Sequence, residues 1–207
     1  MMTYLVTELT PVGKTRTRVC INEEQTLVLS NREITEYGLR LEEEIPETVW
    51  QELEKEMYQR AIRKCGDLLK GMGYTEKGLR EKLLQSGVTE KIADRAVEAM
   101  RDAHYVDDRS YAESYLRGHL ARKSKRRVEQ ELLQKGVAEE IAAEAFAAWE
   151  AENAGGTEEL ERQQIRAFID KKKIDPEQLE WPERQKIMAS LMRKGYSCDA
   201  VRRVLQP

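Results

Sequence analysis

The sequence holds few residues that could perform catalysis, because it has only two histidines and three cysteines. His104 lies just before Asp107 and Asp108, and these side chains could serve as metal ligands or as an acid–base set. A metal site needs a third or fourth ligand at a suitable spacing, and the sequence shows none. We favour the simpler interpretation, in which one helix ends at His104 and the acidic pair caps the next helix. The sequence therefore predicts no catalytic residues, no bound metal and no cofactor.

The cysteines and glycines do not indicate other chemistry. Cys20, Cys65 and Cys198 are widely separated, which fits neither a disulfide framework nor a zinc motif. Cys65 falls on the apolar stripe of a predicted helix and is expected in the core. The glycine-rich loops that bind nucleotide phosphates in known motifs do not occur.

The strongest candidate for a binding site is a basic cluster around a predicted helix start. Ser124 has the properties of an N-cap residue, but Lys125, Arg126 and Arg127 follow it in the first turn, where cations oppose the helix dipole. Such a cluster suits a phosphate or a partner's carboxylates; the alternative is a solvated charged face. The residues that we predict to contact a partner here are Arg117, Arg122, Lys123, Lys125, Arg126 and Arg127.

Further basic groups lie in the last part of the chain. Taken alone, each is interpreted as solvated surface, and cations near a helix end are favourable. They would join the same partner-binding surface if the helical units stack. These residues are Lys171, Lys172, Lys173, Arg193, Lys194, Arg202 and Arg203.

The elements that would position these residues change in type along the chain. Residues 3–7, 15–21 and 26–30 are rich in β-branched side chains and are separated by turns, one of them at 11–14, which predicts a three-stranded meander. A meander of this size needs a helix to pack against. From Pro46 the apolar residues recur mostly every fourth position over about 25 residues. A long helix should therefore follow and end at Gly71-Met72-Gly73.

The rest of the sequence repeats itself around Gly87, Gly136 and Gly195. Each glycine follows a pair of large apolar residues, and further apolar residues recur five and ten positions beyond it. A glycine between two helices is the usual left-handed residue after a helix end. A further helix before each glycine turn completes a three-helix unit. These further helices are expected at residues 61–70, 109–123 and 158–171.

The predicted fold class is mainly α, with three tandem three-helix units in an elongated curved array. A small N-terminal β-meander and a long connecting helix precede the array. Asn153-Ala154-Gly155-Gly156 is the expected linker between the second and third units, and residues 172–182 hold an insertion. The expected domains are 1–45 (β-rich unit), 46–105 (long helix and first three-helix unit), 106–153 (second unit) and 154–207 (third unit).

Composition limits the possible functions. The 207 residues include 35 basic and 38 acidic side chains, and residues 1–60 carry 7 basic and 12 acidic ones. This balance excludes a general nucleic-acid binder that works through overall positive charge. No segment approaches the roughly 18 apolar residues of a membrane span, and the N-terminus lacks a signal-peptide pattern. We expect a cytoplasmic protein that contacts no membrane and acts as a monomer.

Several stretches resemble the RecX family of bacterial recombination regulators. The sequence YTEKGLREKL at residues 74–83 resembles the family's first helix hairpin, and YVDDRSYA at 105–112 resembles its D-D-x-x-[FY]-A junction. Residues 126–137 and 191–197 resemble the second and third hairpins. The order and spacing of these motifs are more specific than any single motif. The motif residues expected to be structural are Asp107, Asp108, Tyr111, Ala112, Gly87, Gly136 and Gly195.

The resemblance implies a non-enzymatic regulator of recombination, DNA repair and the SOS response. RecX proteins bind the RecA recombinase filament on single-stranded DNA and modulate or inhibit its ATP hydrolysis and strand exchange. Family members often have Lys-Gly where this chain has Lys123-Ser124. The alternative is a direct DNA-binding module, since helix–turn–helix pairs also read DNA. Only the predicted helix at 197–205 suits that role, so direct contact with DNA is expected to be weak.

Overall fold

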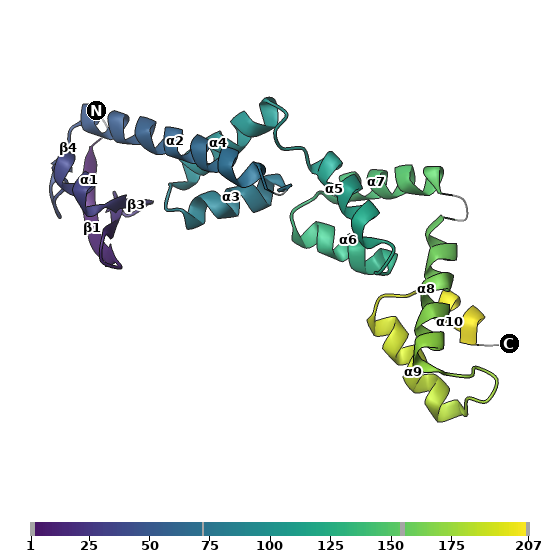
Figure 1. The fold of residues 1–207 in the computed structure, drawn as a ribbon. Coiled ribbons are helices and arrows are strands. Elements are labelled where there is room, and N and C mark those ends of the chain that lie inside the picture. The colour runs from purple at the N-terminus through teal and green to yellow at the C-terminus, as the bar shows by residue number, and fades with distance from the viewer. Residues whose placement is uncertain (1–2, 72, 154–155, 206–207) are drawn as a thin grey trace. The chain divides into compact units, whose positions relative to one another are not determined.

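The structure, a computed structural model, describes residues 3–71, 73–153 and 156–205. The described chain has ten α-helices and one small N-terminal sheet (Figure 1), which confirms the predicted fold class as mainly α with a β-rich start. It divides into two compact units, Met1–Asp107 and Asp108–Pro207. The bounds of the four expected domains stay a prediction.

The sheet of the first unit has four antiparallel strands, whereas the sequence predicted three. The meander of β1 (Tyr4–Val12), β2 (Arg16–Ile21) and β3 (Gln25–Ser30) is present, and β4 (Glu44–Ile45) pairs with β1 to give the order β3-β2-β1-β4. A strand of two residues is too short to show alternation, which explains why it was missed. The predicted turn at 11–14 is also shifted, because β1 continues to Val12.

A short helix that we did not predict follows the sheet. It is α1 (Asn31–Glu36), which begins with a capping box between Ser30 and Glu33. Ser30 and Glu33 have the serine-to-glutamate spacing of that motif. The Glu33 carboxylate also pairs with Arg60. This ion pair ties the end of the sheet to the long helix that comes next.

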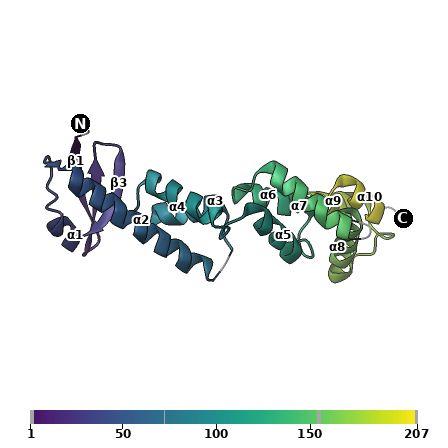
Figure 2. The same cartoon turned by 90° about the horizontal axis from the view of Figure 1, so that it is seen from above.

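The long helix is α2 (Glu47–Leu69), with 23 residues, and it begins just after Pro46, which is its N-cap rather than its first residue. It lies along the sheet and then along the helices that follow, as Figures 1 and 2 both show. The rings of Tyr4 and Trp50 stack with their centroids 5.0 Å apart. The buried residues of α2 recur at helical spacing, and they include Cys65, the cysteine that we predicted in the core. The buried residues are Trp50, Leu53, Met57, Ala61 and Cys65.

Two more helices complete the first three-helix unit. They are α3 (Glu76–Gln85) and α4 (Glu90–Asp102), and Thr89 caps the second of them. α4 ends two residues before the predicted end at His104, which takes a left-handed φ of 57° and whose N–H bonds to the carbonyl of Arg101 at 2.8 Å. Met72, in the predicted stop after α2, lies outside the described residues.

The next three helices, α5 (Asp108–His119), α6 (Lys125–Gln134) and α7 (Glu139–Glu152), share one hydrophobic cluster. The first of them ends four residues before the predicted end at Lys123. Its carbonyl end is followed by a turn in which the N–H of Lys123 bonds to the carbonyl of His119 at 3.0 Å.

The last three helices, α8 (Gly156–Lys172), α9 (Trp181–Arg193) and α10 (Cys198–Leu205), form a further cluster around Ile165, Leu191 and other apolar residues. The expected insertion is present as the loop between α8 and α9. Gly156 belongs to a helix rather than to the linker that we predicted. Ala154 and Gly155 of that linker lie outside the described residues.

The three repeat glycines have nearly identical φ angles. Gly87, Gly136 and Gly195 have φ values of 91°, 92° and 91°. Each lies between the second and third helix of its unit. This left-handed conformation is the one that the sequence predicted for a residue after a helix end.

Candidate partner-binding surface

The start of α6 has the local structure that the sequence predicts. Ser124 is the N-cap residue, and its hydroxyl accepts a hydrogen bond from the Arg127 N–H at 3.3 Å. The first turn contains no acidic residue. Because cations oppose the helix dipole there, their cost must be offset by contacts from elsewhere.

Glu131, one turn further along α6, binds Arg127 of this first turn and also Lys123, which precedes the cap. Its carboxylate accepts hydrogen bonds from Lys123 at 2.6 Å and from Arg127 at 2.8 Å. The hydroxyl of Tyr115 on α5 donates a third at 2.7 Å. Burial raises the pKa of Glu131, but these hydrogen bonds outweigh it and lower the pKa to about 2. Lys123 and Arg127 are therefore held in place by a carboxylate from their own three-helix unit.

A second carboxylate, Glu150 of α7, binds Lys125. The Lys125 ammonium lies 3.0 Å from Glu150 Oε1, and the Thr157 hydroxyl of α8 donates to the same oxygen at 2.6 Å. The hydrogen bonds from Thr157 and Lys125 lower the pKa of Glu150 despite its burial. These contacts give Lys125 a structural role in addition to its predicted role in binding.

The N-terminus of α6 is covered by the turn that follows α9. Ser124 is buried, with only 1% of its surface exposed. Its hydroxyl donates a hydrogen bond to the Lys194 carbonyl at 2.8 Å. A Cβ on Gly195 would lie 3.4 Å from the backbone nitrogen of Arg127. The carbonyl end of one helix thus meets the N–H end of another, which is a favourable arrangement of dipoles. A phosphate would have to displace this turn to reach the helix start.

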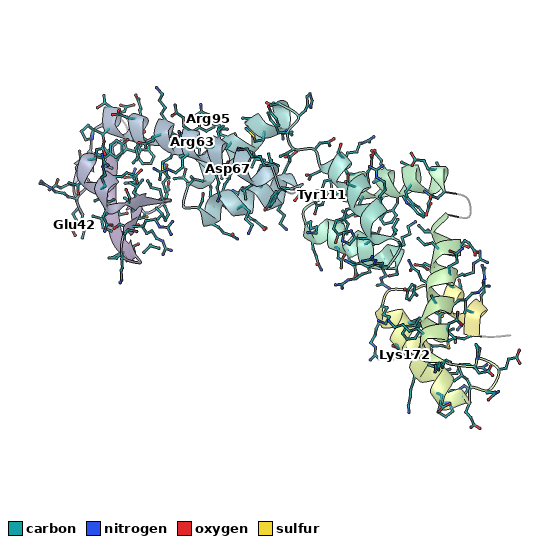
Figure 3. All side chains as sticks on the ribbon, viewed as in Figure 1. Glu42, Arg63, Asp67, Arg95, Tyr111 and Lys172 are labelled. Atoms are coloured by element: carbon teal, nitrogen blue, oxygen red, sulfur yellow. The ribbon has the colours of Figure 1, made fainter. Side chains whose placement is uncertain are left out.

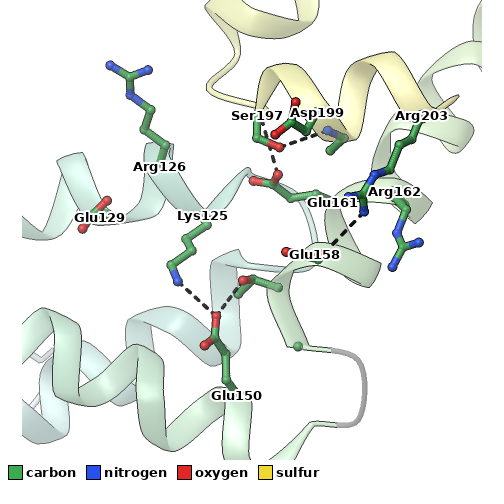
Figure 4. A pocket seen from close by; sticks show the side chains of 13 residues that line it. Lys125, Arg126, Glu129, Glu150, Glu158, Glu161, Arg162, Ser197, Asp199 and Arg203 are labelled. Atoms are coloured by element: carbon green, nitrogen blue, oxygen red, sulfur yellow. Dashed lines mark hydrogen bonds and ion pairs between the residues drawn. The ribbon is translucent and has the colours of Figure 1, made fainter. Parts of the chain in front are cut away.

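A cleft of about 760 Å³ lies where the starts of α6, α8 and α10 meet (Figure 4). Arg203 and Glu158 approach each other across it at 3.8 Å. Four cations line the cleft, together with five carboxylates. The cations are Lys125, Arg126, Arg162 and Arg203, and the carboxylates are Glu129, Glu150, Glu158, Glu161 and Asp199.

The cleft brings together three of the predicted binding residues, Lys125, Arg126 and Arg203, from two three-helix units. Arg126 projects away from the helices around it (Figure 4). Arg162 is a cation of the cleft that we did not predict. In the sequence it is one of several alternating charges at the start of a helix, a pattern that marks no site by itself.

The other predicted residues do not line this cleft. Arg117 lies 3.9 Å from Glu113 on its own helix, and the Lys194 ammonium lies 5.8 Å from the ring centroid of Phe168. Lys173 has a left-handed φ of 53° just after α8, where it ends the helix. Their contact with a partner stays a prediction. The remaining members of this group are Arg122, Lys123, Arg127, Lys171, Lys172 (labelled in Figure 3), Arg193 and Arg202.

The residues of the D-D-x-x-[FY]-A junction surround the start of α5. Asp108 is its first residue, and Asp107 comes just before it. Ala112 is fully buried, and Tyr111, labelled in Figure 3, packs half-buried against the same hydrophobic cluster. Tyr111 also stacks on Tyr115 with ring centroids 5.9 Å apart.

The side chains that could bind a metal are dispersed in the part of the chain that the structure describes. In that part of the chain, no group of three or more His, Cys, Asp or Glu residues could hold a metal ion. His119 instead stacks on Tyr115 with ring centroids 3.9 Å apart, and its Nδ1 lies 2.9 Å from the Tyr115 carbonyl. No helix in residues 3–71, 73–153 and 156–205 is long and apolar enough to cross a membrane.

The fold and the cleft define a tandem-repeat protein of three-helix units, with a charged cleft where two of the units meet. Family models for the second and third three-helix domains of RecX match residues 107–145 and 159–205. The chain is 31% identical over 136 residues to regulatory protein RecX of a Mycobacterium species (strain KMS), which covers 64% of this chain and 73% of the relative. The chain belongs to the RecX family.

Longer alignments and solved structures agree with this assignment. Regulatory protein RecX of Clostridium acetobutylicum is 26% identical over 194 residues, or 93% of this chain and 90% of the relative. A crystal structure of regulatory protein RecX has the same fold, with a TM-score of 0.64 at 18% identity over 99% of this chain and 100% of that one. The crystal structure of RecX from Lactobacillus salivarius has a TM-score of 0.60 at 20% identity, over 73% of this chain and 96% of that one.

Proposed function

We propose that this chain is a non-enzymatic regulator of homologous recombination and DNA repair. It binds the RecA recombinase filament on single-stranded DNA and inhibits ATP hydrolysis and strand exchange by the filament. The observation that carries the proposal is membership of the RecX family, whose relatives named above are regulatory proteins. The partner and the inhibition come from the resemblance to that family.

The charged cleft supports a protein surface as the main contact. Both cations and carboxylates line it, so a partner with charges of both signs would find complementary groups. A bare phosphate backbone would meet the cations but would be repelled by the five carboxylates. The cleft therefore favours the recombinase in the filament over DNA as the group bound there.

The alternative, a direct DNA-binding module, rests on α10 as the reading helix. Arg202 and Arg203 on this helix could contact phosphates. Arg203, however, faces Glu158 across the cleft, and Asp199 near the helix start lines it as well. The acidic residues 1–60 add repulsion, so we expect only weak direct binding to DNA.

The test is DNA-dependent ATP hydrolysis by the cognate RecA, titrated with this chain, while binding to bare single-stranded DNA is followed at two salt concentrations. Inhibition at protein levels too low to coat the DNA is expected. The double variant Arg126→Glu/Arg203→Glu should raise the half-inhibiting concentration roughly tenfold, a loss of about 1.4 kcal/mol. Arg32→Glu/Arg40→Glu, at two exposed positions outside the cleft, changes the net charge by the same amount; it is the matched control and should leave inhibition unchanged.

Two results would contradict the proposal. Unchanged ATP hydrolysis together with tight, strongly salt-dependent DNA binding would favour the DNA-binding module. Equal effects of the cleft variant and of Arg32→Glu/Arg40→Glu would show that general charge, rather than the cleft, determines inhibition.

A further inference from the structure

The turn that ends α9 is fixed to the start of α6 by one hydroxyl group. Ser124 Oγ accepts a hydrogen bond from the Arg127 N–H at 3.3 Å and donates one to the Lys194 carbonyl at 2.8 Å. It therefore caps its own helix and also binds the third three-helix unit. Gly195 permits this approach, because its φ is 91° and any Cβ there would lie 2.6 Å from Ser124 Oγ.

Two further contacts hold the same pair of units together. Gln164 of α8 donates from its side-chain amide to the carbonyl of Leu120 and, at 3.4 Å, to that of Lys123 near the end of α5. Thr157, also in α8, donates to Glu150 of α7. These hydrogen bonds thus connect the third three-helix unit to the second at three separate places, which fixes its orientation as well as its distance.

A glycine turn makes the same kind of contact in the first unit of the chain. The Val28 N–H of β3 donates to the Gly87 carbonyl at 2.7 Å, and a Cβ on Gly87 would lie 2.4 Å from that of Val28. Gly87 and Gly195 hold the same repeat position, yet a strand covers one and a helix start covers the other. The glycine turn is therefore a docking element of the repeat, and its close contacts do not depend on one particular neighbour.

We propose that Ser124 and Gly195 form a joint that positions the third three-helix unit on the second and thereby assembles the partner-binding surface. The joint holds Arg126 of α6 and Arg203 of α10 on one cleft. Ser124 is a positioning residue, because it is buried and acts by fixing the distance between cations that themselves face the cleft. The role in binding rests on the proposed function, whereas the joint itself rests only on the contacts.

The variant Ser124→Asp removes the joint while it keeps a helix cap. Aspartate is as good an N-cap residue as serine, but a carboxylate has no hydrogen to donate and would be repelled by the Lys194 carbonyl. Gln130→Glu, at an exposed position of α6, is the matched control, since it adds the same charge away from the joint. Nitroxide labels at the exposed positions Ala147 and Gln185 report the distance between α7 and α9 by pulsed electron spin resonance.

The labels are placed in a chain that carries Cys198→Ser, so that the half-buried thiol is not modified. We expect one narrow distance in the parent and in Gln130→Glu, and a broad distribution in Ser124→Asp. Affinity for the RecA filament should fall roughly tenfold or more in Ser124→Asp, because cations held in a fixed arrangement bind as a set. It should stay close to the parent value in Gln130→Glu.

Each contrary result has a separate meaning. A narrow distance in Ser124→Asp overturns the joint. A broad distance with unchanged filament affinity overturns the positioning role but leaves the proposed function intact. If the parent chain does not bind the filament, the proposed function and the positioning role fail together, and the label distance still decides whether the joint exists.

Discussion

Glu131 holds Lys123 and Arg127 in place around the start of α6. Its pKa is about 2 in the folded chain, below the ordinary value of 4.5. Its ionic contacts therefore stabilise the fold fully above pH 4.5 and are lost as the pH falls towards 2. The variant Glu131→Gln should lower the free energy of unfolding at neutral pH by up to about 3 kcal/mol, and by much less near pH 2.

Chemical denaturation at pH 7 and at pH 2.5 measures this difference. Glu129→Gln on the same helix is the control, because the free energy of unfolding of this variant should depend on pH as it does in the parent. An equal loss in Glu131→Gln at both pH values would mean that packing, rather than charge, determines the contribution of this side chain.

The same residues show how far the sequence predicts the site. The cap at Ser124 and its basic first turn follow from rules that act within a few residues, so they could be predicted. Arg127 and Glu131 also stand at the i, i+4 spacing of a helical ion pair. Lys125 meets Glu150 across 25 residues and Ser124 meets Lys194 across 70, and no local rule relates positions so far apart. The cleft itself is formed by these distant contacts and was not predicted.

At the scale of the element, the glycine of a repeat turn differs from an ordinary left-handed glycine in how closely other atoms approach it. Gly38 has a φ of 63° and no atom within 4 Å of a Cβ position, whereas Gly87 would place its Cβ 2.4 Å from that of Val28. Gly38→Ala should cost about 1–2 kcal/mol, the penalty of a left-handed alanine. Gly87→Ala should cost a further 1–3 kcal/mol or so, because β3 must move.

Both variants alter the first unit, so the denaturation curves of the full chain can be compared directly. Similar losses for Gly38→Ala and Gly87→Ala would mean that β3 moves without cost and that the turn does not dock it. A larger loss at Gly87 would support the docking role on which the joint at Gly195 also depends.

Element length decides which helices and strands the sequence reveals. The 23 residues of α2 contain six turns of periodic apolar side chains, so its existence and its buried face were predicted. β4 has 2 residues and α1 has 6, which is too few for either period to appear. These short elements depend on tertiary partners instead: β4 on β1, and α1 on the contact between Glu33 and Arg60.

At the scale of the whole molecule, each described hydrophobic cluster lies within one of the two compact units of the chain. One described cluster lies within the first unit and ends at Val106, and the two others lie within the second, where Tyr111 is the first residue to join them. A cut between Asp107 and Asp108 therefore divides none of the described clusters. We expect a fragment of residues 108–207 to fold alone, because a chain of about 100 residues with its own core is large enough to be stable.

The joint between the last two three-helix units should also determine how the fragment unfolds. Inside the fragment, Ser124 binds the Lys194 carbonyl and Gln164 binds the Leu120 carbonyl, so the two clusters should unfold together in one transition. Far-UV circular dichroism should show a helical fragment with a single cooperative melt, and Ser124→Asp should split that melt into two. A fragment that is unfolded would mean that residues 1–107 are required for its stability. Two transitions in the unmodified fragment would mean that the joint is too weak to couple the clusters.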